Sequence, residues 1–227
     1  AASGSARTVS ASASRAEAAY VSNGGADAAL TLGARLNGSL GVTVMLANPH
    51  EELLPTNDCG IVTTGKIKSV KGHFTNFDLV IDQFAAALPS SRSVIKFENC
   101  ANGVETSCDI LIDLTGDTPL FTGWEKRDGY FRAAGDDVTA LAAVEREASQ
   151  MIGEFEKPIY VKYDEDLCAH SRNKIDGCSR CLDVCPAGAI QSLGDQVNID
   201  PAICGGCGLC GAVCPSGAAQ TTYPPAD

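Results

Sequence analysis

Cysteines near the end of the chain have the residue type and the spacing to bind metal. The chain has 227 residues and 11 cysteines, and eight of these lie between residues 168 and 214. Cys204, Cys207, Cys210 and Cys214 are spaced C-x2-C-x2-C-x3-C, and a proline follows the last of them. This spacing is typical of thiolates that bind a 4Fe–4S cluster.

An earlier block of cysteines repeats the pattern with one departure. Cys178, Cys181 and Cys185 keep the spacing and also end in Cys-Pro, but nine residues instead of two separate Cys168 from Cys178. Two such blocks in one short segment are far more specific than a single C-x2-C pair. We therefore predict two 4Fe–4S clusters, with His170 as the alternative to Cys168 at the unusual position.

Iron–sulfur chemistry explains the spacing better than zinc or disulfide bonds do. Each iron of a cubane needs one thiolate and nearby amide donors, which glycine-rich loops at Gly205, Gly206 and Gly208 can supply. Structural zinc has no use for the Cys-Pro element, and C-x2-C-x2-C cannot pair its own cysteines without strain. We expect each of these prolines to turn the chain away from the cluster and to begin a short helix.

Residues 158–223 resemble a bacterial two-cluster ferredoxin. The segments IYVKYDEDLC, CLDVCPAGAI and VNIDPAICGGCGLCGAVCPSGAA occur in the order of its strands, ligands and helices. In that family the fourth cysteine of each block binds the other cluster. The resemblance therefore implies two crossed ligand sets, which are Cys168, Cys178, Cys181 and Cys214 for one cluster and Cys204, Cys207, Cys210 and Cys185 for the other.

The segment before the cysteines has the pattern of an α/β domain. The apolar periodicity predicts, in order, a strand at 18–25, a helix at 26–40, strands at 41–46, 60–72 and 74–84, a short strand at 93–97 and an apolar strand at 108–114. Phe77, Leu79 and Ile81 should point inward. This order, a β-α-β unit followed by a β-meander and a buried strand, resembles the FAD-binding domain of flavoprotein disulfide reductases and of the flavoprotein component of heterodisulfide reductases.

The residues that would bind a dinucleotide depart from that family's pattern. The first strand–helix turn, residues 23–28, keeps only the middle glycine of G-x-G-x-x-G, and Asp27 would repel phosphate. Ala47, Asn48 and Pro49 stand where an acidic residue would bind the ribose. We expect a Rossmann-like scaffold without tight dinucleotide binding, and we do not expect flavin as a cofactor.

The pattern divides the chain into four parts. They are a flexible Ala/Ser-rich tail or linker at 1–18, a Rossmann-like α/β domain at 19–131, a connecting helix within 132–157 and a small α+β two-cluster ferredoxin domain at 158–227. Asp136 or Asp137 can cap the helix, and Pro158 ends it. Because the chain does not begin with Met, we expect it to be a fragment of a longer protein.

Other reactive residues lack companions in the sequence. Cys59, Cys100 and Cys108 match no ligand spacing, so we expect buried or idle thiols. Asp113 lies in an apolar strand, where a carboxylate more often bonds backbone amides than performs catalysis. No catalytic residues are identified, and the insertion 169–177 is expected to lie at the surface, where Arg172 could contact an acidic partner.

Charge and hydropathy narrow the function further. The net charge of −11 disfavours nucleic acid, and no apolar run is long enough to span a membrane, so we expect a cytoplasmic protein. Segments such as CDILIDLTGDTPLF and GEFEKPIYV resemble the long multidomain iron–sulfur proteins encoded beside molybdenum formate dehydrogenases. We therefore hypothesise an electron-transfer module whose redox protein partner is related to formate dehydrogenase. The alternatives are an accessory or maturation factor for a formate dehydrogenase and a flavin- or nicotinamide-linked oxidoreductase subunit.

Overall fold

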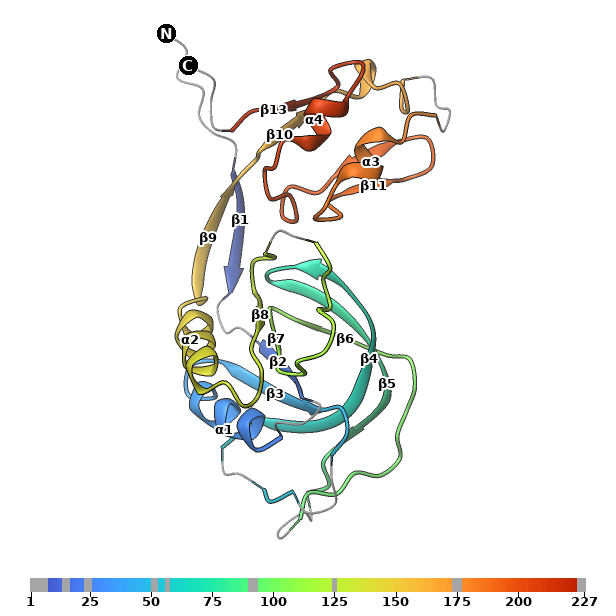
Figure 1. Ribbon diagram of the computed structural model, residues 1–227. Helices are drawn as coiled ribbons and strands as arrows, with labels where there is room; N and C mark the ends of the chain where they lie inside the picture. Colours follow the sequence, from blue (N-terminus) through green and yellow to red (C-terminus); the bar gives the residue numbers. More distant parts are fainter. Residues whose placement is uncertain are drawn as a thin grey trace. The chain divides into compact units, whose positions relative to one another are not determined.

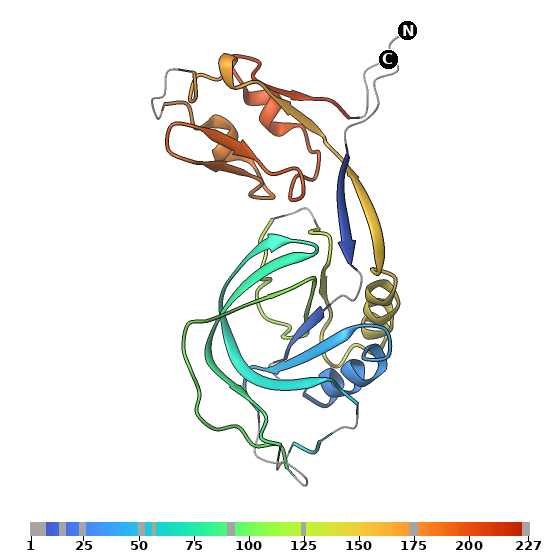
Figure 2. The ribbon, with the colours of Figure 1, turned by 180° about the vertical axis from the view of Figure 1, so that it is seen from behind.

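The chain folds into two compact units, which are described separately. The computed structural model describes residues 8–13, 17–22, 26–49, 53–55, 58–89, 94–123, 126–172 and 177–223. The α/β unit comprises Ser12–Thr122 and Asp128–Gly153. The cysteine-rich unit comprises Ala1–Ala11, Gly123–Arg127 and Glu154–Asp227 (Figures 1 and 2).

A seven-stranded mixed sheet forms the α/β unit, in the order β6-β5-β4-β3-β2-β7-β8. Its strands are β2 (Glu17–Ser22), β3 (Gly41–Leu46), β4 (Ile61–His73), β5 (Asn76–Ala86), β6 (Val104–Cys108), β7 (Ile110–Asp113) and β8 (Tyr130–Arg132). Neighbouring strands in the series β4-β3-β2-β7-β8 are parallel. The strand β5 is antiparallel to both of its neighbours, β4 and β6. The predicted β-α-β unit and the predicted hairpin are therefore confirmed.

Two helices pack together beside the sheet. In α1 (Ala26–Leu36), five small or apolar residues are buried, because they recur at helical spacing and face the sheet. Gly33 allows a close approach, since a Cβ there would lie 2.8 Å from a side-chain carbon of Val44. The second helix, α2 (Val138–Ser149), begins at Asp137, whose side chain accepts a hydrogen bond from the Ala140 amide at 2.9 Å.

The core of the sheet follows the predicted alternation. Phe77, Leu79 and Ile81 of β5 are buried and pack with Met45 and Leu111, while Asp78 is exposed. The strands β4 and β5 carry two register shifts, which bend this long hairpin. The alternation thus fixes which face of the hairpin packs inward.

Several predicted boundaries are wrong. The strand predicted at 93–97 is absent from its described residues, where Phe97 makes a single bridge to Ala87. The predicted tail contains a strand, β1 (Thr8–Ala13), which pairs with β9 (Gly153–Pro158) where a helix was predicted. Pairing between distant segments decides the second case, and local sequence does not encode it.

Besides most of the β1–β9 pair, the described residues of the cysteine-rich unit form two small antiparallel sheets and two short helices. The strand β10 (Val161–Tyr163) pairs with β13 (Ala219–Thr221), and β11 (Ile190–Ser192) pairs with β12 (Val197–Ile199). The helices are α3 (Arg180–Val184) and α4 (Leu209–Val213), and a 3-10 turn, η1, covers Glu165–Leu167.

The short helices precede the prolines instead of following them. Cys185 and Cys214 end α3 and α4, and Pro186 and Pro215 come next in turns. The prediction that a helix starts after each proline is therefore wrong. A residue before proline is disfavoured in the helical conformation, so each helix stops at the last cysteine of its block.

Candidate metal centre

Four cysteines, three from the second block and one from the first, line one cavity. This cavity is small, with a volume of about 20 Å³, and it is lined by Cys185, Cys204, Cys207 and Cys210 together with apolar residues of β10, β11 and β12. We call these four cysteines the second group. Cys185 thus lies with the cysteines of the other block, as the crossed ligand pattern requires.

The loop between Cys204 and Cys207 depends on glycine. Gly206 has a φ of +80°, in the left-handed region, and a Cβ there would lie 2.5 Å from the ring of Tyr160. Tyr160 packs edge-on against Tyr223 at a centroid distance of 5.7 Å. Any side chain at position 206 would displace this ring or the loop that carries the two cysteines.

Burial is the main electrostatic influence on two cysteines of the second group. It raises the pKa values of the Cys204 and Cys210 thiols, and the neighbouring thiols raise them further. Hydrogen bonds from the backbone amides of Gly206 and Gly211 act in the opposite direction. Amides that point at these sulfurs are the donors that a metal-bound thiolate needs.

We call Cys168, Cys178, Cys181 and Cys214, which the ferredoxin resemblance implies as one ligand set, the first group. Cys168 is 7% exposed. Burial raises the pKa of the Cys181 thiol, and the charges of Cys168 and Cys178 raise it further. Burial raises the pKa of Cys168, but hydrogen bonds from Tyr163 and from the amides of Ser171 and His170 outweigh it, so this pKa is lowered. The surroundings of Cys168 therefore stabilise a thiolate, although nine residues separate it from Cys178.

Cys214 packs against the core of the cysteine-rich unit, to which cysteines of both groups contribute. Burial raises the pKa of the Cys214 thiol, but hydrogen bonds from the Ala219 amide and from Ser216 lower it overall. The Ser216 hydroxyl lies 3.6 Å from the Cys214 sulfur. Cys214 therefore has the same thiolate-stabilising surroundings as Cys168.

His170 occupies a buried position with both ring nitrogens engaged. The ring is part of a side chain that is 1% exposed; Nδ1 lies 3.0 Å from the Cys178 carbonyl oxygen and Nε2 lies 2.9 Å from that of Gly194. Each ring nitrogen therefore lies against a backbone carbonyl oxygen, within hydrogen-bonding distance. This geometry favours Cys168 over His170 as the metal ligand.

The insertion that carries His170 is partly buried, which corrects the prediction of a surface loop. His170 and Ser171 are 1% and 3% exposed, whereas Ala169 and Arg172 are exposed. Burial is tolerated because the polar atoms are paired: the Ser171 hydroxyl lies 2.8 Å from that of Tyr163 and accepts the Val197 amide at 3.2 Å. Lys174, in the same insertion, lies outside the described residues.

The arrangement fits a polynuclear group better than a single ion. Within the described ranges, no three His, Cys, Asp or Glu side chains converge closely enough to hold one metal ion. A single zinc would need its sulfur ligands about 2.3 Å from one point. The thiols instead surround a cavity, and amide donors and a glycine loop adjoin it, which is the donor set that a 4Fe–4S cluster needs.

Comparison with known protein families supports this assignment. Residues 174–218 match the 4Fe-4S dicluster domain. The matched range contains seven of the eight block cysteines and begins after Cys168. The dicluster domain supports iron–sulfur cluster binding and a role in electron transfer. No curated protein matches the chain significantly.

The remaining candidate residues lie elsewhere. Cys59 and Cys108 are buried and Cys100 is exposed. Asp113 is 1% exposed at the end of β7, and it accepts hydrogen bonds from the amide and the hydroxyl of Thr115 at 2.9 and 2.6 Å. The expected bonding to a backbone amide is therefore confirmed.

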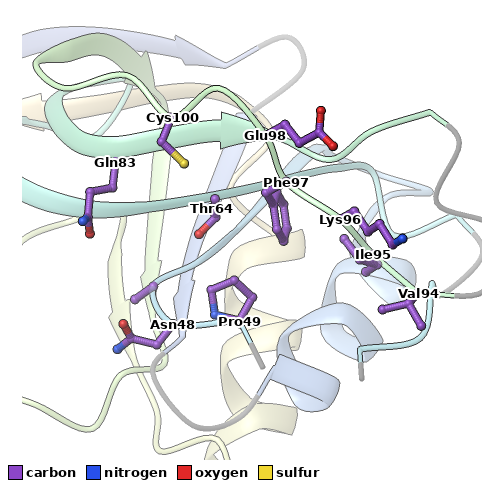
Figure 3. A pocket seen from close by; sticks show the side chains of 11 residues that line it. Asn48, Pro49, Thr64, Gln83, Val94, Ile95, Lys96, Phe97, Glu98 and Cys100 are labelled. Carbon is purple, nitrogen blue, oxygen red and sulfur yellow. The ribbon is translucent and has the colours of Figure 1, made fainter. Parts of the chain in front are cut away.

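The α/β unit contains a larger open cavity beyond the carboxyl end of β3. It has a volume of about 800 Å³, with Asn48 and Pro49 on one side and the segment around Phe97 on the other (Figure 3). Thr64 and Gln83, from β4 and β5, complete its wall. The sequence did not identify this cavity, because the residues that line it come from four separate segments.

Proposed function

We propose that the chain transfers electrons through two 4Fe–4S clusters with crossed cysteine ligands. The observation that carries the proposal is that Cys185 lies with Cys204, Cys207 and Cys210 around one cavity, although it belongs to the other sequence block. When bound, each cluster supplies a one-electron redox couple. The chain provides thiolates, amide donors and a buried setting, and Cys207 is exposed, so one ligand lies where a redox partner can approach.

The test is metal analysis after anaerobic purification. We expect eight irons and eight acid-labile sulfides per chain. Cys185→Ser should disturb the cluster of the second group, and Cys214→Ser the cluster of the first group. Cys100→Ser is the matched control, because Cys100 is an exposed thiol outside both groups. Stoichiometric zinc without a visible charge-transfer band would contradict the proposal.

For the α/β unit we propose a Rossmann-like scaffold that does not retain flavin. The parallel order β4-β3-β2-β7-β8 corresponds to the 3-2-1-4-5 order of a Rossmann sheet, which supports the scaffold. No carboxylate directly follows β3, where Ala47, Asn48 and Pro49 begin the next segment, which argues against tight binding of a ribose. FAD or FMN released at about one per chain would overturn the flavin part of this proposal.

The open cavity beside β3 favours the second candidate, a nicotinamide- or flavin-linked oxidoreductase subunit. A cavity of about 800 Å³ is large enough for a nucleotide-sized ligand. Reduction of the clusters by NADH or NADPH, measured by loss of their visible absorbance, would establish this candidate. A chain whose clusters are reduced by dithionite but not by either nucleotide supports the electron carrier.

The physiological partner is proposed from chemistry and context. An exposed Arg172 and an exposed cysteine ligand would suit a cytoplasmic redox protein with an acidic docking face, such as one related to formate dehydrogenase. Arg172→Ala should then slow electron exchange, with a defect that shrinks at high salt. Stable binding to a metal-free formate dehydrogenase without any exchange would instead favour a maturation factor. In the described part of the chain, no helix has the length and apolarity needed to cross a membrane.

A further inference from the structure

A short segment far from the cysteines in sequence packs onto the loop after Cys185. Gly123–Arg127 belongs to the cysteine-rich unit. A Cβ at Gly123 would overlap the carbonyl oxygen of Pro186, so the segment approaches this loop as closely as backbone can. The Arg127 guanidinium donates a hydrogen bond to the Ala187 carbonyl oxygen, two residues beyond Cys185.

A second cation is attached to the loop before Cys204. The Lys157 ammonium donates a hydrogen bond to the Ala202 carbonyl oxygen at 3.0 Å. Arg127 and Lys157 are both half-buried, so water screens their charges less than those of exposed side chains. The charge of Lys157 reaches the Cys204 thiol and lowers its pKa, although burial still raises that pKa overall.

Among the described residues, the carboxylate of Asp200 opposes the charge of Arg127. Asp200 lies near enough to Arg127 to act on it electrostatically: burial lowers the pKa of the guanidinium, and Asp200 and Cys185 act in the opposite direction. Asp200 is half-buried, and its side chain accepts a hydrogen bond from the Ala202 amide at 2.9 Å. Two cations and one anion therefore lie beside the loops that carry Cys185 and Cys204, and these three residues together are net positive.

The surroundings of the first group differ. The groups that act on Cys168 and Cys214 are neutral hydrogen-bond donors, namely the Tyr163 and Ser216 hydroxyls and backbone amides. The cations beside this group in the described chain, Arg172 and Arg180, are exposed, and water screens them. The two groups of cysteines therefore differ in local charge within one small unit.

We propose that Arg127 and Lys157 raise the reduction potential at Cys185, Cys204, Cys207 and Cys210 above that at the first group. A positive charge stabilises the more negative, reduced state, so the site that carries it gains the higher potential. An electron from an external donor therefore passes from the cluster of the first group to the cluster of the second group. This transfer oxidises the first cluster and reduces the second. This proposal rests on the proposed function, because it requires both clusters.

The test is a redox titration with dithionite, followed by EPR, on the intact chain. Arg127→Gln and Lys157→Gln should each make electron uptake at one cluster about tenfold less favourable, a shift of 59 mV to lower potential for a one-electron couple. Asp200→Asn should shift the same midpoint upward. The exposed Lys162→Gln is the matched control for loss of one charge in this unit and should leave both midpoints in place. Cys207→Ser identifies which signal belongs to the second group.

The outcomes separate this proposal from the proposed function. A wild-type chain that binds no clusters refutes both. A wild-type chain with two titrating clusters, whose midpoints do not move in Arg127→Gln and Lys157→Gln, refutes the role of the cations alone. Arg127→Lys keeps the charge, so it should retain the wild-type midpoint. If Arg127→Lys lowers this midpoint as far as Arg127→Gln does, the effect comes from packing and the charge argument fails.

Discussion

The carboxylate of Asp113 should be the most sensitive single position in the α/β unit. It is 1% exposed and accepts four hydrogen bonds: two from Thr115, one from the Tyr130 hydroxyl at 2.8 Å and one from Nε of Arg132 at 3.2 Å. Asp113→Asn replaces one accepting oxygen by an NH₂ group, which can only donate. Either the two Thr115 donors or the donors of Tyr130 and Arg132 then face an NH₂ group instead of an accepting oxygen.

The size of the effect follows from the bonds that are lost. A hydrogen bond to a charged group contributes about 1.5–3 kcal/mol, and breaking a buried ion pair costs about 3–5 kcal/mol. The Arg132 side chain is 35% exposed, so water screens its share of the interaction. Tyr130 can also rotate its hydroxyl. We therefore expect Asp113→Asn to lower the free energy of unfolding by about 3 kcal/mol, a large part of the typical 5–15 kcal/mol.

Hydrogen exchange in increasing urea is the suitable assay. The chain has two units, so a single unfolding curve would mix their transitions, whereas peptides that cover β7 report on the α/β unit alone. Asp78→Asn is the matched control, because Asp78 is exposed on β5, and it should change the stability by less than about 0.5 kcal/mol. Equal protection of β7 in Asp113→Asn and wild type would refute the reasoning.

Three further predictions concern other parts of the chain. Gly206→Ala should reduce the iron content of purified protein by about half, because the added methyl group meets the Tyr160 ring. Gly38→Ala, where a Cβ meets no atom within 4 Å, is the control and should retain full iron. Equal iron content in the two variants would contradict the packing argument. Burial raises the pKa of Tyr130 above its ordinary value of about 10, as does its hydrogen bond to a carboxylate, so its folded state favours the neutral phenol. The contribution of Tyr130 to the free energy of unfolding should be fully present below pH 10 and should decrease above it. Tyr130→Phe should remove this decrease from the plot of unfolding free energy against pH. An unchanged plot would contradict the raised pKa of Tyr130. Glu145→Gln should change the unfolding free energy by less than about 0.5 kcal/mol in urea denaturation, because the 3.2 Å ion pair with Arg35 is exposed; a loss above 1 kcal/mol would show that it contributes more.

The sequence predicted those elements that local periodicity encodes. The strands β3, β4 and β5 and the helix α1 have clear apolar patterns, and the structure confirms them to within a few residues. The strand β6, with the sequence VETSC, was missed because its residues are mostly exposed at the sheet edge and do not alternate. The three-residue strand β8 is too short to show any period.

The candidate site was predictable in its ligands but not in its surroundings. Cysteine spacing predicts which side chains come together, because each block is local in sequence. Arg127 and Lys157 lie 60 and 45 residues from the carbonyl groups that they bond, and no motif marks either of them. The burial of His170 was likewise unexpected, since it depends on acceptors at Cys178 and Gly194 that only the folded chain brings together.

The pairing of β10 with β13 has a consequence for the cysteine-rich unit as a polymer. Val161 pairs with Thr221, so two three-residue strands close a loop that contains every cysteine of both blocks. Closing so long a loop costs entropy, and so short a strand pair returns little of it. With the proposed crossed ligands, each cluster would cross-link the two halves of the loop, once through Cys185 and once through Cys214, much as disulfide bonds would. Cluster insertion is then the step that completes the folding of this unit, and the metal-free chain should be its protease-sensitive form.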